Sequence, residues 1–208
     1  MRAEVVLLAG YKRTGKDTLY KQLRAYPGET VAAWSVYCHA EAIKAFPTLI
    51  NVKRLAFADA LKEEVAEHYH MSVPDDMKDE RVFDCLDVQH KSARDLYTEW
   101  AKIRRASDPE YWAKLLGSQI KRNGKYVVTD WRFPNEYTYL DERVTKLVTA
   151  RVFRSHVPIP AASEESEHAL DTWATQYLIV PESLHDEDFR KAVEVFPFYK
   201  DYVQCDTL

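Results

Sequence analysis

The residues whose types and spacing could do chemistry form a short loop near the start of the chain. Gly10 is followed by four residues and then by Gly15 and Lys16, which is the spacing of a loop whose backbone amides cradle phosphates. In such a loop the lysine bridges the β- and γ-oxygens of a nucleoside triphosphate, and the glycine before it permits close approach of the backbone. We therefore expect ATP to be bound by Gly10, Lys12, Arg13, Thr14, Gly15, Lys16, Asp17 and Thr18.

Asp17 stands where these loops normally carry a Ser or Thr that holds Mg²⁺. A carboxylate beside a triphosphate is strongly repelled unless a divalent cation or a basic partner lies between them. Magnesium prefers oxygen ligands and keeps several waters, so Asp17 would bind it directly or through water. Asp130, at the end of a strand, would be the second acid that organises the metal. The alternative for Asp17 is stabilisation of the first helical turn, where the dipole favours an anion.

Three cationic residues are expected to act on the transferred group, and they are Lys16, Arg13 and Arg132. Arg13 lies inside the loop and would contact the γ-phosphoryl oxygens as an arginine supplied in cis, a role worth roughly 10³ to 10⁵ in rate. Arg132 would clamp a phosphate and Glu136 would orient an arginine, although a plain surface ion pair explains Glu136 equally well. For Lys12 and Arg13, simple exposure to solvent is the alternative.

A second anion site is expected because this chemistry brings two polyanions together. A phosphate monoester is a suitable acceptor, since its oxygens are largely deprotonated near neutral pH and need little help from a general base. Arg94 would lie in the first turn of a helix, where the helix dipole does not favour a cation, so a bound anion would explain its position. For Arg104 and Arg105, a solvated helix face is an equally good explanation. The candidate residues for this site are Arg94, Arg104, Arg105, Arg151 and Arg154.

Alternating strands and helices must position these residues. Buried strands are predicted by the short apolar runs at residues 3–9, 52–57, 125–130, 144–153 and 176–180, the last taken as the final strand. A strand followed by a short helix is predicted over 30–46, and further helices over 15–25, 59–69, 92–105, 107–120 and 184–195. This order predicts an α/β fold of three layers, in which helices flank a mostly parallel sheet and ligands lie at the carboxyl ends of the strands.

Helix starts and inward faces follow from caps and apolar spacing. Asp59 is expected to cap the helix that it begins, and Ser92 with Asp95 forms a capping box for the next helix. Ser107 or Asp108 would cap the helix after that. The inward-facing residues are expected to be Leu61, Val65, Tyr69, Leu96, Trp100, Ile103, Trp112, Leu115 and Leu116.

Composition limits the class of protein. The 208 residues, 46% hydrophobic and 30% charged, suit one soluble globular domain, and the net charge of −4 argues against binding to polymeric nucleic acid. No apolar run is long enough to cross a membrane. Cys38, Cys85 and Cys205 are far apart and in no metal or redox spacing, which predicts free or buried thiols in a reducing cytoplasm.

Six blocks of the sequence together are similar to the deoxynucleoside monophosphate kinases of bacteriophages and related viruses. They are AGYKRTGKDT, AFADALKE, ARDLYTEW, DPEYWAKLL, VVTDWRFPNE and SEHAL. The resemblance implies a single P-loop kinase domain over residues 1–208, with a substrate flap near 70–108 and a lid or late loop within 132–172. It also implies Mg²⁺-dependent transfer of the ATP γ-phosphoryl group to a deoxynucleoside monophosphate in the cytoplasm, of the host if the protein is viral. A homodimer is compatible with it.

The same resemblance assigns substrate contacts. It places Asp59 and Lys62 at the acceptor nucleotide, and Arg94 with Arg132 at its phosphate. Aromatic residues near the expected substrate site favour a nucleotide whose base stacks on them. At helical spacing, however, such residues more often belong to the core. The substrate-binding residues are thus expected to be Asp59, Lys62, Arg94, Trp100, Asp130, Arg132, Glu136 and Glu167.

Two other functions stay open from the sequence. One is a kinase for another small phosphorylated metabolite, resembling animal phosphomevalonate kinase, which also carries Asp after the loop lysine. The other is a nucleotide-binding switch without catalysis, which would leave the cations that converge on the site without a purpose.

Overall fold

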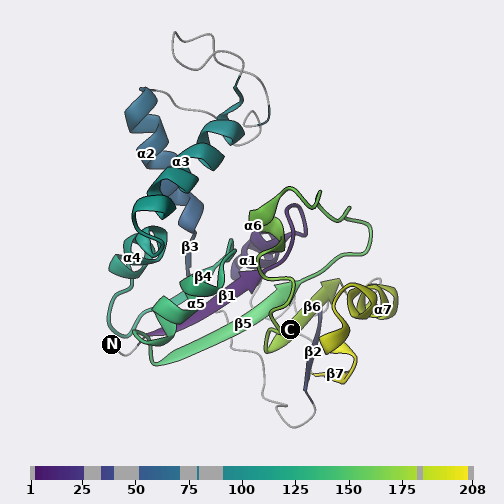
Figure 1. Ribbon diagram of the computed structural model, residues 1–208. Helices are drawn as coiled ribbons and strands as arrows, with labels where there is room; N and C mark the ends of the chain where they lie inside the picture. The colour runs from purple at the N-terminus through teal and green to yellow at the C-terminus, as the bar shows by residue number, and fades with distance from the viewer. Residues whose placement is uncertain are drawn as a thin grey trace. The chain divides into compact units, whose positions relative to one another are not determined.

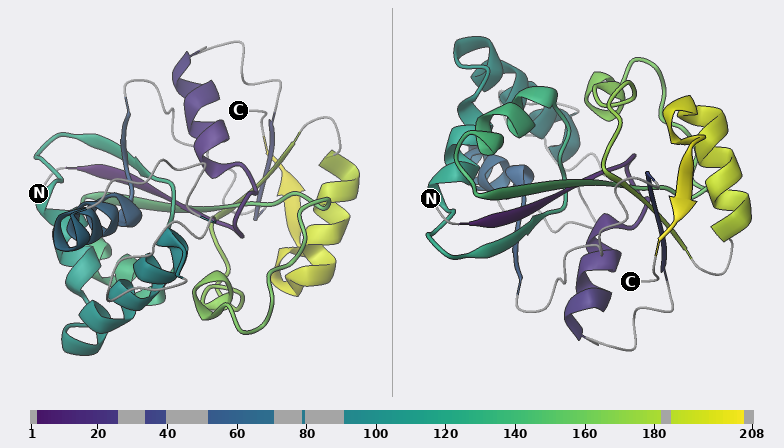
Figure 2. Two further views of the ribbon diagram at one scale, coloured as in Figure 1. Left: turned by 90° about the horizontal axis from the view of Figure 1, so that it is seen from above. Right: turned by 90° about the horizontal axis from the view of Figure 1, so that it is seen from below.

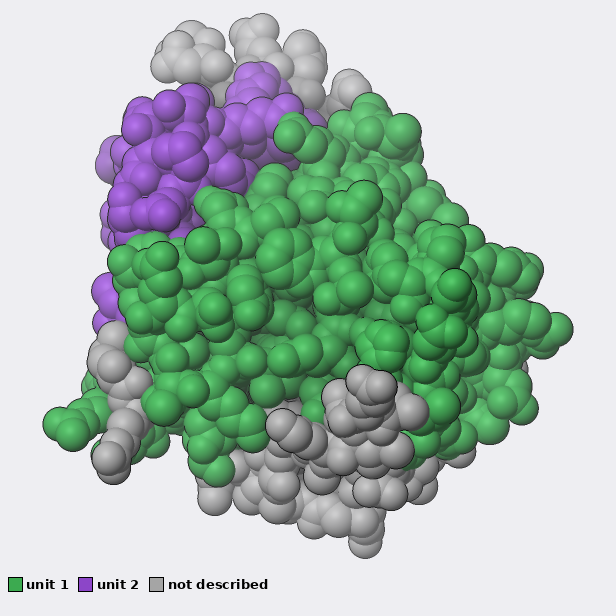
Figure 3. Space-filling view, turned by 60° about the horizontal axis from the view of Figure 1, so that its bottom comes forward, with its two compact units in different colours: residues 1–55, 120–208 green, residues 56–119 purple. Residues whose placement is uncertain are grey.

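The structure is a computed structural model that describes residues 3–25, 34–39, 52–70, 79, 91–181 and 185–205. The chain forms two compact units. The first consists of Met1–Leu55 and Ile120–Leu208, and the second of Ala56–Gln119 (Figure 3). No helix among the described residues combines the length and the apolar content that crossing a membrane requires.

Among the described residues, seven strands form a mixed sheet at the centre of the first unit (Figure 1). In spatial order the strands are β3 (Lys53–Leu55), β4 (Lys125–Val128), β1 (Glu4–Ala9), β5 (Lys146–Val152), β6 (Tyr177–Pro181), β2 (Trp34–His39) and β7 (Tyr202–Gln204). Neighbours from β3 to β6 are parallel, whereas β2 runs antiparallel to β6 and to β7. The prediction of an α/β fold with a mostly parallel sheet is confirmed.

Helices on both faces of the sheet explain why its central strands are continuous apolar runs. All residues of β1 after Glu4 are buried, as expected for a parallel strand that is covered on both sides. Figure 2 shows α1 (Lys16–Ala25) on one face, and α6 (Glu165–His168) and α7 (His185–Val195) on the other. The first unit also contains α5 (Pro134–Asp141) and a 3-10 helix, η4 (Pro197–Tyr199).

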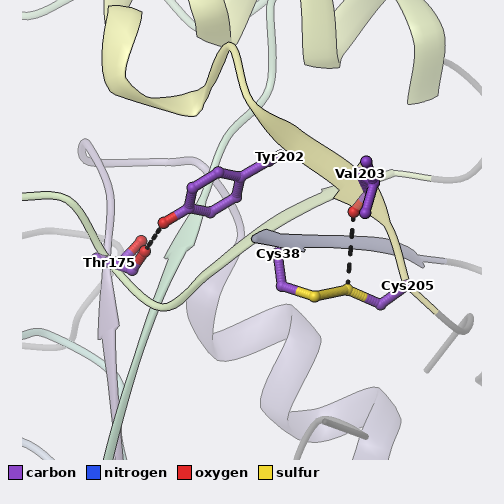
Figure 4. The surroundings of a disulfide bond; sticks show 5 residues. All are labelled: Cys38, Thr175, Tyr202, Val203 and Cys205. Atoms are coloured by element: carbon purple, nitrogen blue, oxygen red, sulfur yellow. Dashed lines mark hydrogen bonds between the residues drawn. A yellow bond between two sulfur atoms is a disulfide. The ribbon is translucent and has the colours of Figure 1, made fainter. Parts of the chain in front are cut away.

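The edge strand β7 was not predicted, and the prediction that 176–180 forms the final strand is wrong. β7 has only three residues, too few to give a periodic pattern, and it exists because it pairs with β2. The buried Tyr202 anchors it, since its hydroxyl donates to the carbonyl oxygen of Thr175 (Figure 4). The strand predicted within 30–46 is β2, and the helix predicted after it lies outside the described residues.

Three helices form the described part of the second unit, α2 (Phe57–Tyr69), α3 (Ala93–Ser107) and α4 (Tyr111–Ser118). The buried side chains of Val65 and Leu96 join α2 to α3. Around them pack the partly buried residues Leu61, Tyr69, Tyr97 and Trp100. Most of the apolar stripe predicted from the helical spacing is therefore in the core of this unit.

The capping box of α3 was predicted correctly, but the cap of α2 was not. Ser92 Oγ accepts the backbone N–H of Asp95 at 3.2 Å, and the Asp95 carboxylate accepts the N–H of Ser92 at 2.9 Å. Helix α2 begins at Phe57, so Asp59 lies in its first turn and not at the cap. Burial of Phe57 accounts for the earlier start, because this side chain is only 6% exposed.

The predicted start of α4 and the predicted burial of Ile103 are also wrong. Helix α3 continues through Ser107, so neither Ser107 nor Asp108 caps α4, whose N-cap is Glu110. Ile103 is 60% exposed, because the apolar cluster of the second unit ends one turn earlier on α3.

A disulfide joins Cys38 of β2 to Cys205, which follows β7 (Figure 4). The expectation of free thiols is therefore wrong for these two residues. They are separated by 167 positions in the sequence, but strand pairing brings their Cα atoms to 6.3 Å, within the range that a disulfide can bridge. Cysteine spacing along the chain cannot reveal such a pair.

Candidate phosphate-binding site

The loop between β1 and α1 depends on glycine at both ends. Gly10 has φ 132° and Gly15 has φ 94°, values that residues with a side chain rarely adopt. A Cβ atom on Gly10 would lie 2.4 Å from the carbonyl oxygen of Val152, so only glycine fits beside the end of β5. Within the loop, the buried hydroxyl of Thr14 donates to the carbonyl oxygen of Tyr11 at 2.9 Å. The loop is thus a tight turn at the carboxyl end of β1.

Lys16 is held inside this loop. Its ammonium group donates to the carbonyl oxygens of Gly10 at 2.7 Å and Tyr11 at 2.8 Å, and the residue is only 7% exposed. Burial, helped by the positive charge of Arg132, lowers the pKa of Lys16 to about 7, although nearby carboxylates act in the opposite sense. An anion bound by the loop amides would stabilise the ammonium form.

Binding of a polyphosphate at pH 8 is expected to take up close to one proton. With a pKa of about 7, Lys16 is mostly neutral at this pH, and a bound polyanion would raise the pKa and protonate the amine. Affinity for the anion should accordingly fall as the pH rises above about 7. Calorimetric titration with MgATP in buffers of different ionisation enthalpy measures the uptake, which should disappear towards pH 6. The control Lys21→Met, at an exposed position of α1, should retain it, and no uptake at pH 8 in the wild type would contradict the expectation.

Asp17 has a basic partner in this structure. Its Oδ1 accepts from Nε of Arg54 at 2.9 Å and from the hydroxyl of Thr129 at 2.8 Å. Partial burial alone would raise the pKa of Asp17, but the hydrogen bonds from Arg54 and Thr129 and the nearby positive charges hold it below its usual value. Sequence reasoning missed Arg54, and the only signal for it was its position near the carboxyl end of a strand.

Two carboxylates of the segment around α6 contact the cations of the loop region. Arg132 Nη1 lies 2.5 Å from Glu167 Oε2, which also accepts the backbone N–H of Lys12 at 2.7 Å. The ammonium of Lys12 pairs with Glu164 at 2.5 Å. Lys12 is therefore not merely solvated, and Glu167 links the loop after β1 to the segment after β4.

Glu136 acts on the backbone that carries Arg132. It is 2% exposed, and its Oε2 accepts the backbone N–H groups of Arg132 at 2.9 Å and Phe133 at 3.0 Å. The alternative of a plain surface ion pair is wrong, because the carboxylate is buried at the start of α5. Asp130, just before this segment, is partly exposed, and its charge raises the pKa of Lys16.

Replacing Glu136 by alanine is expected to lower the free energy of unfolding by about 1.5–3 kcal/mol, because two backbone N–H groups lose a charged acceptor. Urea unfolding measures this change. Glu142→Ala is the matched control, since Glu142 is a surface residue just after α5 and its loss should change stability by no more than about 0.5 kcal/mol. Equal stability of the two variants would show that the buried carboxylate does not organise the segment.

A second set of contacts, which the sequence did not reveal, holds the segment around α6 against the loop. The hydroxyl of Tyr11 donates to Asp171 at 3.0 Å, and Nδ1 of His168 lies 2.7 Å from the same carboxylate oxygen. The hydrogen bond with Asp171 raises the pKa of His168. Tyr11 and Asp171 are 160 positions apart, so no spacing could have indicated their contact.

Four predicted substrate-binding residues belong to the second unit. Asp59 and Lys62 lie on α2, and Arg94 forms an ion pair with Asp79. Trp100 packs in the core of this unit, and its indole N–H donates to Glu64 at 2.8 Å. The same carboxylate accepts from Arg104 at 2.9 Å, and the guanidinium lies 5.1 Å from the centre of the Trp100 ring.

Arg151 does not belong to an anion site. It is 2% exposed, and it donates to the hydroxyl of Tyr199 at 3.1 Å and to the carbonyl oxygens of Leu170 and Trp173. Its guanidinium also lies 4.1 Å from the centre of the Phe196 ring. These contacts make it a structural residue that joins β5 to the carboxyl-terminal part of the first unit.

Asp17 and Asp130 would be the residues that hold Mg²⁺. The charges of both raise the pKa of Lys16, and Asp17 Oδ1 already accepts from Arg54 and Thr129. Magnesium usually takes one or two carboxylates and completes its shell with phosphate oxygens and water. In the part of the chain that the structure describes, no three His, Cys, Asp or Glu side chains converge to hold an ion by themselves. The other ligands would therefore come from phosphate and water.

Neither a protein-family model nor a curated protein sequence matches the chain significantly.

Proposed function

We propose that this protein is a Mg²⁺-dependent kinase that transfers the γ-phosphoryl group of ATP to a deoxynucleoside 5′-monophosphate. The observation that carries the proposal is the ammonium of Lys16, enclosed by a glycine-bounded loop at the carboxyl end of β1 and influenced by the charges of Arg132, Asp17 and Asp130. In α/β sheets this edge is where ligands bind. The fold would then be a P-loop kinase fold with a flap and a lid, acting in the cytoplasm.

These residues would position the phosphates and stabilise the negative charge of the transferred group. Phosphoryl transfer passes through a loose transition state with charge spread over the oxygens of the transferred group. Lys16 would exchange the carbonyl oxygens of Gly10 and Tyr11 for phosphate oxygens, and Arg132 would exchange Glu167 for a phosphate. Asp17 and Asp130 would hold Mg²⁺, which would supply positive charge that neutralises part of the phosphate charge.

Closure over both nucleotides would exclude water, which otherwise competes with the acceptor. The segment around α6 is suited to this role, because Glu167 and Glu164 already contact Arg132 and Lys12. The identity of the acceptor rests on the sequence resemblance, whose blocks include Asp59, Lys62 and Arg94 of the second unit.

A coupled assay of ADP release with all common nucleoside monophosphates tests the proposal. ADP formation should be slow with ATP alone and should rise sharply with one or more deoxynucleoside monophosphates. The same rate with and without every monophosphate would reject it. A rise only with a non-nucleotide phosphate such as phosphomevalonate would identify a metabolite kinase, and ATP binding without transfer to any acceptor would identify a switch.

A further inference from the structure

Arg154 follows β5 and its guanidinium lies against the phosphate-binding loop. A Cβ atom on Gly15 would lie 3.0 Å from Nη2 and 3.2 Å from Cζ of Arg154, so the guanidinium rests on the backbone of Gly15. Its Cζ is also 4.9 Å from the centre of the Trp34 ring. The indole N–H of Trp34 donates to Gln22 of α1 at 2.8 Å, which fixes the orientation of this ring. The flat guanidinium of Arg154 thus contacts Gly15 and the Trp34 ring through its faces, and these contacts hold it beside the loop.

The polar edge of the Arg154 guanidinium, unlike its faces, is not satisfied by the residues that the structure describes. Its Nε is buried and has no hydrogen-bond partner among the described residues, nor does a described carboxylate pair with it. Arg54, Arg132 and Arg151 of the same unit, by contrast, contact Asp17, Glu167 and Tyr199. A buried unpaired donor is costly, and its retention calls for an explanation such as a ligand.

We propose that Arg154 binds the polyphosphate of the donor nucleotide, together with Gly15 and Lys16, and not the phosphate of the acceptor. The sequence alone grouped Arg154 with a second anion site, whereas its contact with Gly15 places it at the first. A guanidinium stacked on an aromatic ring keeps its N–H groups available in one plane, a geometry suited to two phosphate oxygens. The inference rests on the proposed function of the loop.

Calorimetric titration with inorganic tripolyphosphate, which carries no base or sugar, tests the inference. Arg154→Met keeps an unbranched apolar side chain and removes the charged guanidinium, and it is expected to weaken binding about 10- to 100-fold. Arg143→Met is the matched control, because the Cζ of Arg143 lies 3.6 Å from the centre of the Tyr139 ring, but its guanidinium has Glu142 and a backbone carbonyl as partners. Its affinity should stay within about twofold of wild type.

Unchanged tripolyphosphate binding by Arg154→Met would overturn the inference. A variant that binds MgATP more weakly but tripolyphosphate normally would also overturn it, because the guanidinium would then recognise the nucleoside. Circular dichroism and thermal melting test whether the Arg154→Met variant is folded. Arg154→Gln, which keeps an N–H donor but no charge, is measured in parallel. If the methionine variant does not fold, unchanged tripolyphosphate binding by Arg154→Gln would overturn the inference in its place.

Failure of the proposed kinase function and failure of the inference on Arg154 give different results in these assays. If no acceptor yields ADP but tripolyphosphate binds and Arg154→Met weakens it, the kinase proposal falls and the inference on Arg154 stands. If Lys16→Met weakens binding and Arg154→Met does not, the inference falls and the loop assignment stands. If the wild-type protein does not bind tripolyphosphate, both the loop assignment and the inference on Arg154 are wrong.

Discussion

Replacing Lys16 by methionine is expected to lower the rate of phosphoryl transfer at least about 100- to 1,000-fold. The loop encloses the ammonium and holds it on the carbonyl oxygens of Gly10 and Tyr11. A fixed cation in a site with little water stabilises developing charge much more than the same cation in solution. Methionine has a similar unbranched shape but offers no charge to the transferred group.

Loss of activity in Lys16→Met must be distinguished from loss of folding. The variant loses two hydrogen bonds, but it also loses the cost of burying an amine whose pKa burial lowers to about 7. These effects oppose each other, so thermal melting should show a folded protein with a transition close to that of the wild type. Lys21→Met, on the exposed side of α1, should keep full activity. A folded Lys16→Met protein with more than about a tenth of the wild-type rate would contradict the assigned role.

Replacing Arg13 by alanine is expected to lower turnover by roughly 10³- to 10⁵-fold, the range observed for arginines that stabilise the transferred phosphoryl group. Arg13 is exposed in the loop between β1 and α1 and has φ 67°. A non-glycine residue in this left-handed region costs roughly 1–2 kcal/mol. Backbone strain of this kind often occurs at functional sites, and the role of the side chain itself is what the substitution tests.

A second substitution separates the backbone of Arg13 from its charge. Arg13→Gly should relieve the strain and melt at a higher temperature than Arg13→Ala, but it should be equally impaired in turnover. Arg122→Ala is the control, because Arg122 is exposed in a turn of the same unit and should be replaceable without loss. A reduction of less than about threefold in Arg13→Ala would exclude the catalytic role.

The parts of the fold that sequence predicted well depend on residues that are close together in the chain. The strand before Gly10, the loop and the helix from Lys16 form one continuous pattern of apolar run, glycine spacing and helix start. The capping box of Ser92 and Asp95 is another local pattern. Where local signals compete with burial, as at Phe57 and Asp59, burial determined where the helix begins.

The roles of the arginines depend on contacts that sequence spacing does not contain. Arg151 and Arg154 are three positions apart and were grouped together, yet Arg151 is buried within β5 and Arg154 lies beyond its end against Gly15. Arg54 was not selected at all, although it holds Asp17. Whether a charged side chain is structural or available to a ligand is set by the neighbours that folding brings to it.

The sequence by itself determined the alternation of strands and helices that makes an α/β fold, the glycine-bounded loop and the lysine that the loop encloses, because these follow from propensity and spacing over a few residues. Only the tertiary structure decided which charges meet: Asp17 with Arg54, Glu167 with Arg132, and Cys38 with Cys205. Hydrogen bonds, ion pairs and disulfides require atoms within a few ångströms of one another, and segments distant in the sequence reach such distances only when the strands pair and the helices pack.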